Sequence, residues 1–517
     1  MQFMDLNEDI IFYILEILLI KYDAGRTMDT ECWQPDLAAL ARTCRTLKDP
    51  SLDVLWRTQY SFSVQLVKTL PVDALEITAE LTPAWGEDKE FIFLKRTLLP
   101  SDWERFFVYA SRIKHLFVGT SRCIGPGWKG VHHSTFCALA ASSPTSCLLP
   151  NLSTFNICCT DWILGSGCNL PSCLATMFHQ DLRSLKCEAG FSNQTLISMF
   201  DAISHCHQMK ELVIEATQAL FLANMHPGLS HLQSFKTGEY NLLFSLDALF
   251  EIGMWDRLVE LEITISRDFT PEDIICRGAR GKYFPALRRL SLATYALPLI
   301  SAFIAGVQST QLEDIHLDVY ATFTPATLPE VYDYLTQLRS ISVIVHQVFK
   351  SRKRDARSGA SIFTPLIPFR KLRTVKILSR RVSKAKAFTA ADIAVIPQAW
   401  PNLEFLDLGV FCSRDVTLSD VADLATRCPR LWKLCNHFDA TSVPDISAGQ
   451  SSDNSGAHVS SKLRVLDVAD SPVKDPERVV AFFSQRFPNI EQLICGHEYE
   501  YDLWDSVRQS LDLEVEE

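Results

Sequence analysis

The amino-acid sequence predicts an α/β solenoid, a parallel sheet lined by helices, preceded by a small all-α unit. Three observations carry this prediction. A six-residue apolar pattern recurs at a bounded spacing, the intervals carry helix start and stop signals, and the first 60 residues follow a purely helical pattern. The chain has 517 residues, 47% hydrophobic and 21% charged, which excludes global disorder and a coiled coil.

Residues 1–60 are expected to form two or three short helices. Apolar side chains recur at helical spacing through residues 6–20 and again through residues 36–56. Asp36 is expected to cap the second helix. Such a unit is too small to bury much core of its own. The simplest interpretation is an N-terminal cap of the solenoid.

The order of residues in this unit resembles the F-box family. The chain reads Leu6-Asn7-Glu8-Asp9-Ile10-Ile11, then Ile14-Leu15 and Leu18, then Asp36-Leu37 with Leu40. The family begins Leu-Pro-x-Glu-Ile/Leu-Leu and continues with Ile-Leu and then Asp-Leu with a following Leu. Asn7 stands where the family has Pro, and the stretch 21–35 is longer than the usual link.

F-box proteins are the substrate-recognising subunits of Skp–cullin–F-box ubiquitin ligases. The resemblance therefore implies that a Skp-family adaptor packs on apolar residues of this unit. The implied adaptor-binding residues are Leu6, Ile10, Ile14, Leu15, Leu18, Leu37 and Leu40.

Residues 61–105 are expected to be a connector or N-terminal cap. The stretch 100–113 resembles the segment that joins F-box to repeats in fungal F-box proteins. Within it, Ser101 and Glu104 have capping-box spacing, which predicts a helix that begins there.

The recurring pattern is L-x-x-L-x-L, with fourteen copies at a mean step of about 29 residues. Its last two apolar positions are two residues apart, the spacing of a strand with one buried face. The copies begin at Ile113, Leu152, Leu182, Met209, Leu232, Leu258, Leu287, Leu312, Leu338, Leu372, Leu403, Leu431, Leu463 and Ile490. The pattern resembles the leucine-rich-repeat family. We expect a solenoid over 106–505, with loop insertions near 350–362 and 447–461 and an acidic tail at 506–517.

The intervals between copies carry helix signals. Thr270 with Asp273 and Thr389 with Asp392 resemble capping boxes. Two Pro residues stand at first helical positions after a capping residue, in Thr324-Pro325 and Asp475-Pro476. Four more lie two residues before a copy, where Pro ends a helix: Pro285, Pro401, Pro429 and Pro488.

Acidic residues recur at strand positions that point away from the core. If the strands stack in parallel, these charges share one face and, we expect, one register. They form a candidate substrate-binding surface for a basic segment of a protein partner. Solubility of a solvated face is the alternative explanation. The residues are Glu211, Glu215, Glu260, Glu262, Asp314 and Asp318.

Composition and motifs point away from several function classes. The net charge of −11 does not suit a chain that coats nucleic acid, and the apolar stretch 10–20 is too short to span a membrane. The sixteen Cys include no C-x-x-C pair, so we expect free thiols and no metal site. The glycine pattern at 125–130 is a poor phosphate loop because Pro126 removes a backbone donor. We therefore expect no catalytic residues and no cofactor.

A basic block lies at residues 350–386, where thirteen Lys or Arg accompany a single Asp. Its first part, Lys350–Arg354, resembles a nuclear-import sequence, although a solvated loop between repeats is the alternative. The block agrees with a protein that is cytoplasmic, nuclear or both.

These patterns and resemblances together favour a substrate-recognition subunit of a ubiquitin ligase, with a Skp-family adaptor, a cullin ligase and a protein substrate as partners. The alternative is a leucine-rich-repeat scaffold that binds a protein and has no ubiquitin role. Neither interpretation involves nucleic acid or membrane.

Overall fold

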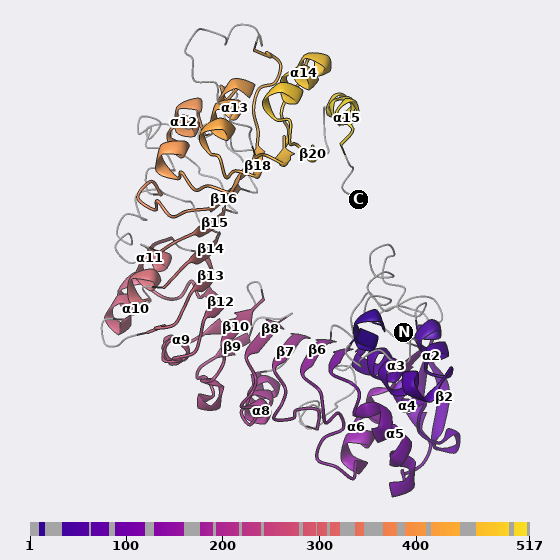
Figure 1. Cartoon of the computed structure of the whole chain (residues 1–517). Coiled ribbons are helices and arrows are strands. Elements are labelled where there is room, and N and C mark those ends of the chain that lie inside the picture. Colours follow the sequence, from indigo (N-terminus) through magenta and orange to yellow (C-terminus); the bar gives the residue numbers. More distant parts are fainter. Residues whose placement is uncertain are drawn as a thin grey trace. The chain divides into compact units, whose positions relative to one another are not determined.

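The structure is a computed structural model (Figure 1), and its chain divides into two compact units, Met1–Leu258 (the first unit) and Val259–Glu517 (the second unit). It describes residues 10–15, 34–60, 64–81, 88–118, 129–159, 176–189, 193–216, 220–238, 242–278, 283–295, 297–307, 311–320, 337–345, 366–379, 388–409, 415–444, 462–495 and 501–513. Within this part of the chain, none of the helices has the length and apolarity that crossing a membrane requires.

The first unit begins with helices, as expected. Residues 10–15 are helical, and they are followed by α2 (Gln34–Leu40) and α3 (Arg45–Arg57). The expected cap at Asp36 is wrong, because α2 begins two residues earlier and Asp36 lies in its first turn. A break after Leu40 separates α2 from α3, so the described part of this unit has three helical segments, within the expected two or three.

A three-stranded sheet follows in the first unit. β2 (Leu75–Leu81) pairs antiparallel with β3 (Asp88–Leu94), which pairs in parallel with β5 (Lys129–Val131). The short helix α4 (Val64–Val67), the 3₁₀ turns η2 (Val72–Ala74) and η3 (Pro100–Asp102), and the helices α5 (Trp103–Ala110) and α6 (His133–Ser142) belong to the same region.

The expected capping box at Ser101 and Glu104 is also wrong. Asp102 Oδ2 instead accepts the backbone N–H of Leu99 at 2.8 Å and the guanidinium of Arg96 at 2.6 Å. The carboxylate of Asp102, one residue after Ser101, thus accepts the backbone N–H at the start of η3. The turn η3 comes immediately before α5.

The repeats of the first unit build a parallel sheet in chain order. Each printed pairing is parallel and free of register shifts, from Thr58↔His115 at one end to Ser234↔Glu211 at the other. Its strands are β1 (Thr58–Tyr60), β4 (His115–Val118), β6 (Thr154–Cys159), β7 (Ser184–Ala189), β8 (Glu211–Ala216) and β10 (Ser234–Thr237). The outer elements are α8 (Asn193–Ile203), η6 (Pro227–Leu229), α9 (Leu246–Gly253) and the parallel pair β9 (Leu220–Leu222) and β11 (Leu242–Phe244).

The second unit continues the same construction with parallel neighbours. A register shift occurs between Asp407 and Gly409, where Gly409 has a positive φ of 51°. The strands are β12 (Glu260–Ile265), β13 (Arg289–Thr294), β14 (Asp314–Val319), β15 (Ser340–Val345), β16 (Thr374–Ser379), β17 (Phe405–Gly409), β18 (Lys433–Asn436), β19 (Val465–Asp467) and β20 (Gln492–Ile494).

Every one of the fourteen sequence copies coincides with a strand, and β1 is an additional strand that the pattern did not predict. The apolar positions of the copies are the core. In β13, for example, Leu290 and Leu292 are 2% and 0% exposed, while Ser291 and Ala293, which alternate with them, are less buried. The fold prediction of a leucine-rich-repeat solenoid with a parallel sheet and flanking helices is therefore confirmed.

Helices cover one side of the sheet in the second unit, and Figure 1 shows α10 and α11 on one side of β12–β14. They are α10 (Pro271–Gly278), α11 (Leu297–Gly306), α12 (Ala390–Ala399), α13 (Leu418–Arg427), α14 (Pro476–Arg486) and α15 (Tyr501–Ser510). In each unit, we call the open face the side of the repeat sheet that carries the outward residues of the strands, which alternate with the buried apolar residues.

The helix signals act as expected where they are described. Thr270 and Asp273 form reciprocal hydrogen bonds, as do Thr389 and Asp392. Asp475 caps α14, with Pro476 at the first helical position. A third box, Thr417 with Asp420, was missed. The Thr324-Pro325 signal lies outside the described residues.

Three of the four prolines end helices as the sequence predicts. The prediction is wrong for Pro285, because α10 ends at Gly278 and Phe284, just before Pro285, has a positive φ of 57°. α12, α13 and α14 stop one residue before Trp400, Cys428 and Phe487, and each of these leaves the helical region because a Pro follows it.

Candidate protein-binding surfaces

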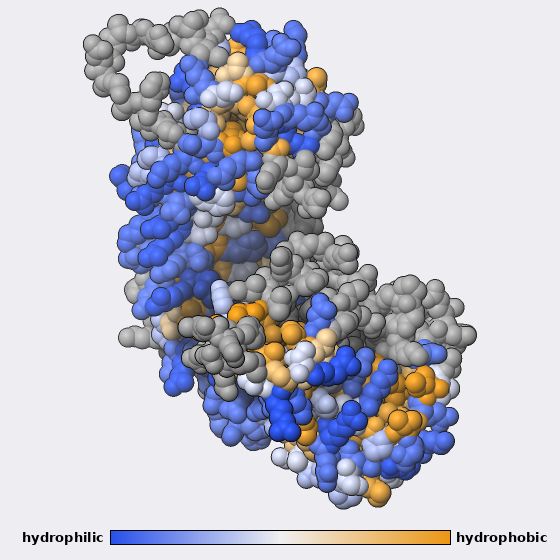
Figure 2. All heavy atoms as spheres, turned by 45° about the vertical axis from the view of Figure 1, so that its right-hand side comes forward, coloured by the Kyte–Doolittle hydropathy of each residue, from blue (hydrophilic) through white to orange (hydrophobic). Residues whose placement is uncertain are grey.

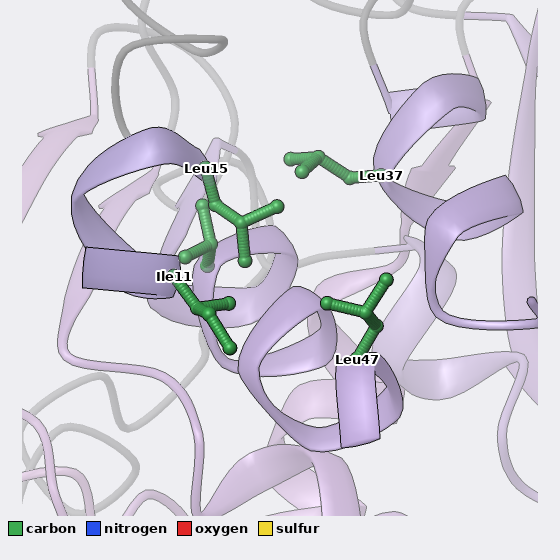
Figure 3. Close-up of a cluster of buried hydrophobic side chains, with 5 residues drawn as sticks. Ile11, Leu15, Leu37 and Leu47 are labelled. Atoms are coloured by element: carbon green, nitrogen blue, oxygen red, sulfur yellow. The ribbon is translucent and has the colours of Figure 1, made fainter. Parts of the chain in front are cut away.

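The N-terminal helices enclose a small core of their own. Ile11 and Leu15 from residues 10–15, Leu37 from α2 and Leu47 from α3 point toward one another (Figure 3), and Val54 completes the cluster. All five are at most 8% exposed. This core holds the three helical segments in one arrangement.

That core separates the implied adaptor-binding residues into different classes. Leu15 and Leu37 are buried in the chain itself, so they support the helices and cannot offer their side chains to a partner in this arrangement. Ile14 and Leu40 are partly buried, and Ile10 is 47% exposed. Leu6 and Leu18 lie outside the described residues.

Tyr13, which the sequence analysis did not single out, is 65% exposed on the same helical segment as Ile10. The two residues are three apart, a spacing that places both on one face of a helix. The described part of the candidate adaptor surface is therefore Ile10 with Tyr13, flanked by Ile14.

The acidic residues of the repeats lie on the open face, but they do not share one register. Glu211, Glu260 and Asp314 each start a strand, whereas Glu262 lies two residues further along and Glu215 and Asp318 four residues further. The expectation of one register is wrong because the charges fall at three successive outward positions of the strands.

In the first unit, a neighbouring repeat engages both carboxylates. Ser184 Oγ of β7 donates to Glu211 Oε2 at 2.8 Å, and Lys186 Nζ lies 2.6 Å from Glu215 Oε1. Parallel stacking brings these groups opposite one another, since Ser184 pairs with Glu211 in register. Glu215 is therefore paired with a base, whereas Glu211 keeps its charge and accepts a hydrogen bond from a neutral hydroxyl.

In the second unit, Arg289 stands between two acidic strands. It pairs in register with Glu260 of β12 and Asp314 of β14, and its Nη2 lies 3.1 Å from Glu260 Oε2. Burial raises the pKa of Asp314, and the neighbouring Glu313 raises it further. Glu262 lies beside this group, opposite Ser291. A basic partner that approaches here has to compete with Arg289.

Asp318 is only 8% exposed, which makes it the least accessible of the six acidic residues. Tyr320 Oη lies 3.4 Å from its Oδ2, and the rings of Tyr320 and Tyr295 lie 5.3 Å apart. Tyr295 is 45% exposed, so an aromatic pair borders the acidic positions where β13 and β14 end. Aromatic faces attract cations, and no motif in the sequence points to this pair.

The described part of the basic block is held in contacts between repeats. Lys371 donates to Gln337 at 2.7 Å, Arg373 pairs with Glu404 at 3.4 Å, and Lys376 lies 3.7 Å from Asp407. The import-like stretch Lys350–Arg354 lies outside the described residues.

The described residues contain no group of three or more His, Cys, Asp or Glu side chains that could hold a metal ion. Cysteines in this part of the chain are free thiols, several of them buried, and burial raises the pKa of Cys206 to about 11. Of the glycine pattern, Lys129 and Gly130 belong to β5.

Figure 2 shows the visible surface as a mosaic, in which orange hydrophobic patches are interrupted by blue hydrophilic side chains. Strand register thus defines candidate surfaces more clearly than hydropathy does. The two described surfaces are the N-terminal pair Ile10 and Tyr13 and the charged open face of the repeats.

No family model matches the chain, and no curated protein matches it. Among solved structures, it is similar to a leucine-rich-repeat protein of Leptospira interrogans, with 13% identity and a TM-score of 0.36 over 68% of this chain and 79% of that one. It is also similar to a leucine-rich-repeat-containing protein of Legionella pneumophila, with 12% identity and a TM-score of 0.32 over 67% of this chain and 95% of that one.

Proposed function

We propose that the chain is a protein-binding repeat protein that acts as the substrate-recognition subunit of a Skp–cullin–F-box ubiquitin ligase. The observation that carries the proposal is the F-box-like order of residues 6–45, which coincides with a separate helical core in front of the repeats. In this role the chain supplies recognition, and other subunits supply the ubiquitin chemistry.

The adaptor would contact the apolar face that the helical core leaves outward. Ile10 and Tyr13 are 47% and 65% exposed, and they lie three residues apart on one helical segment. An exposed apolar pair on a helix is the kind of surface that packs against a partner helix. Leu15 and Leu37 would act indirectly, by holding that helix in place.

The double substitution Ile10→Asp/Tyr13→Asp tests the adaptor surface. Burying two carboxylates in an apolar interface is costly, so co-purification of a recombinant Skp-family adaptor should be lost. The matched control is Val72→Asp/Leu99→Asp, since these side chains are 87% and 57% exposed elsewhere in the first unit. Retention of the adaptor by the Ile10/Tyr13 variant would contradict the proposal.

The substrate would be captured on the repeats, and the acidic open face of the second unit favours a basic segment. The peptide (Lys-Ser)₆, with (Gln-Ser)₆ as the neutral control, provides a direct probe. Glu260→Lys/Glu262→Lys should weaken its binding through charge reversal. Arg289→Ser should strengthen the binding of the peptide, because Arg289 forms an ion pair with Glu260 and so competes with the peptide for this carboxylate. Unchanged affinity in both variants would assign the acids to solubility alone.

A repeat scaffold without a ubiquitin role is the second candidate. Arg112, which precedes the first repeat strand, donates to the carboxylates of Asp49 and Asp53 in α3. This contact and the closed helical core suit a terminal cap of the solenoid. The scaffold is favoured if the capture of a protein partner persists while no Skp-family adaptor co-purifies with the unsubstituted chain.

The proposal expects the protein in the cytoplasm, the nucleus or both. Replacing the Lys and Arg residues of Lys350–Arg354 with Ser should shift a fluorescent fusion from the nucleus to the cytoplasm if this stretch directs import. An unchanged distribution would favour a solvated loop.

A further inference from the structure

We propose that the edge of the first unit at which the repeat strands begin is a docking surface for an acidic peptide segment of a partner protein. This surface is distinct from the open face and from Ile10 and Tyr13. It does not depend on the ubiquitin role.

The surface is built on a row that the backbone fixes. We call it the entry row: the residue that follows the first apolar residue of each repeat. In the first unit each member donates its backbone N–H to the carbonyl of the preceding member: Ser153 to Lys114, Arg183 to Ser153, Lys210 to Arg183 and Gln233 to Lys210, at 2.8 Å each. The side chains therefore follow one another at the strand spacing, roughly 4.8 Å.

Three of these five residues are basic, none is acidic, and Lys114, Arg183 and Lys210 are exposed. Within the described residues, none of the three forms an ion pair. Their separations of roughly 5–15 Å are comparable to the Debye length of about 8 Å at physiological ionic strength. The three charges therefore act partly together on an approaching anion.

Two carboxylates that lie close to the row in the sequence, Asp181 and Glu211, contact other groups. Asp181 Oδ2 lies 3.3 Å from His179 Nδ1, and Glu211 accepts a hydrogen bond from Ser184. His115, next to Lys114, adds little charge of its own, because burial and then the positive charges of Arg57 and Lys114 lower its pKa.

The corresponding row of the second unit is different. There, Arg339 pairs with Glu313, Arg373 with Glu404, and Arg464 with Glu491, at 3.4–3.7 Å. The same backbone positions thus carry compensating charges in one unit and uncompensated positive charges in the other. An uncompensated row is what an acidic partner would complement.

A short acidic peptide fits this row better than a nucleic acid does. Lys114, Arg183 and Lys210 span three strand spacings, roughly 14 Å, and alternate residues of an extended peptide are roughly 7 Å apart. Four or five residues with alternate acids therefore cover the row. A long polyanion would also meet Glu188, Glu211 and Glu215 on the adjoining open face, in a chain of net charge −11.

The test measures binding of fluorescein-labelled (Glu-Ser)₆ to the full chain, with (Gln-Ser)₆ as the neutral probe. Lys114→Gln/Arg183→Gln/Lys210→Gln should reduce the affinity about tenfold, and binding to the unsubstituted chain should weaken as NaCl rises. The matched control is Lys68→Gln/Lys95→Gln/Arg105→Gln, which removes the same charge from exposed positions of the first unit that lie off the row.

The proposal is supported if only the row variant loses affinity. It is overturned if (Glu-Ser)₆ binds no better than (Gln-Ser)₆, or if both triple variants lose affinity equally. Tighter binding of a twelve-nucleotide oligothymidylate than of (Glu-Ser)₆, lost in the row variant, would overturn the peptide assignment in favour of nucleic acid. Circular dichroism of each variant reports that the fold is retained.

Discussion

The entry rows of the two units share one backbone arrangement and differ in charge. In both, a carbonyl of one repeat accepts backbone N–H groups from the next, as Lys210 accepts from Gln233 and Ser234 and Glu313 accepts from Arg339 and Ser340. In the first unit, the charged residues of the row are all basic. In the second unit, basic and acidic residues of the row form ion pairs between repeats. These backbone hydrogen bonds do not depend on the side chains, so the charge of the entry row can vary from repeat to repeat. Binding properties can therefore change along the repeats while the fold stays constant.

The largest expected effect is on the free energy of unfolding. In both units, substitutions in the buried core should lower it far more than substitutions at outward positions. Leu212 in the first unit and Leu317 in the second are 0% and 1% exposed. Each Leu→Ala substitution should cost about 2–5 kcal/mol in urea unfolding, because it leaves a cavity. Lys210→Ala and Ser291→Ala should stay within about 0.5 kcal/mol. Equal losses for core and outward positions would contradict the solenoid core.

The core is also the part that the sequence predicts best. An apolar pair two residues apart at every repeat leaves one choice of buried face, and Pro401, Pro429 and Pro488 mark where helices end. Local rules of this kind depend on neighbours in the chain. For the same reason the Thr389 and Asp392 capping box was predictable.

The candidate surfaces were less predictable because they depend on contacts between repeats. The repeat register places Arg289 between Glu260 and Asp314, but it does not say which side chains of neighbouring strands pair, such as Lys186 with Glu215. The cap prediction at Ser101 failed because Asp102, one residue further along, accepts the backbone N–H of Leu99. The cap prediction at Asp36 failed because α2 begins two residues earlier. Exposure of Tyr13 likewise followed from the packing of Leu15 and Leu37.

The next prediction uses pH to distinguish a compensated charge from a buried one in the second unit. Burial raises the pKa of Asp407, although Lys376 lies 3.7 Å away. Lys376 and Cys435 are its in-register neighbours on the two adjacent strands, and Asp467 lies one strand beyond Cys435. A raised folded-state pKa means that ionised Asp407 opposes folding near neutral pH. That penalty is relieved as the pH falls through the raised pKa toward the unfolded value of about 3.9.

Wild type should therefore gain stability between pH 7 and pH 4.5 relative to Asp407→Asn, which keeps the acceptor for Gly409 N–H but cannot titrate. Urea unfolding of both proteins across this range measures the difference. A difference that stays constant, or that moves in the opposite direction, would show that Lys376 holds Asp407 ionised without cost.

A smaller effect is expected from the ion pairs themselves. A double-mutant cycle on Arg373 and Glu404 should give a favourable coupling of about 0.2–1 kcal/mol that declines in high salt, because both side chains are partly exposed. The matched cycle on Arg183 and Lys210 should give zero or an unfavourable coupling, since two like charges occupy neighbouring strands. A favourable coupling between Arg183 and Lys210 would contradict the difference in charge pairing between the entry rows of the two units.

The smallest expected change in stability comes from giving the first unit the charge alternation of the second. Gln233 is exposed and follows Lys210 in the entry row, so Gln233→Glu places a carboxylate beside that base without a change of shape. The new pair should alter the free energy of unfolding by only a few tenths of a kcal/mol. It should nevertheless weaken binding of (Glu-Ser)₆, because it compensates one row charge and repels the peptide. Gln65→Glu, exposed on α4, is the isosteric control and should leave the affinity unchanged. If both substitutions reduce the affinity to the same extent, the peptide senses net charge alone, and the entry row would have no particular role.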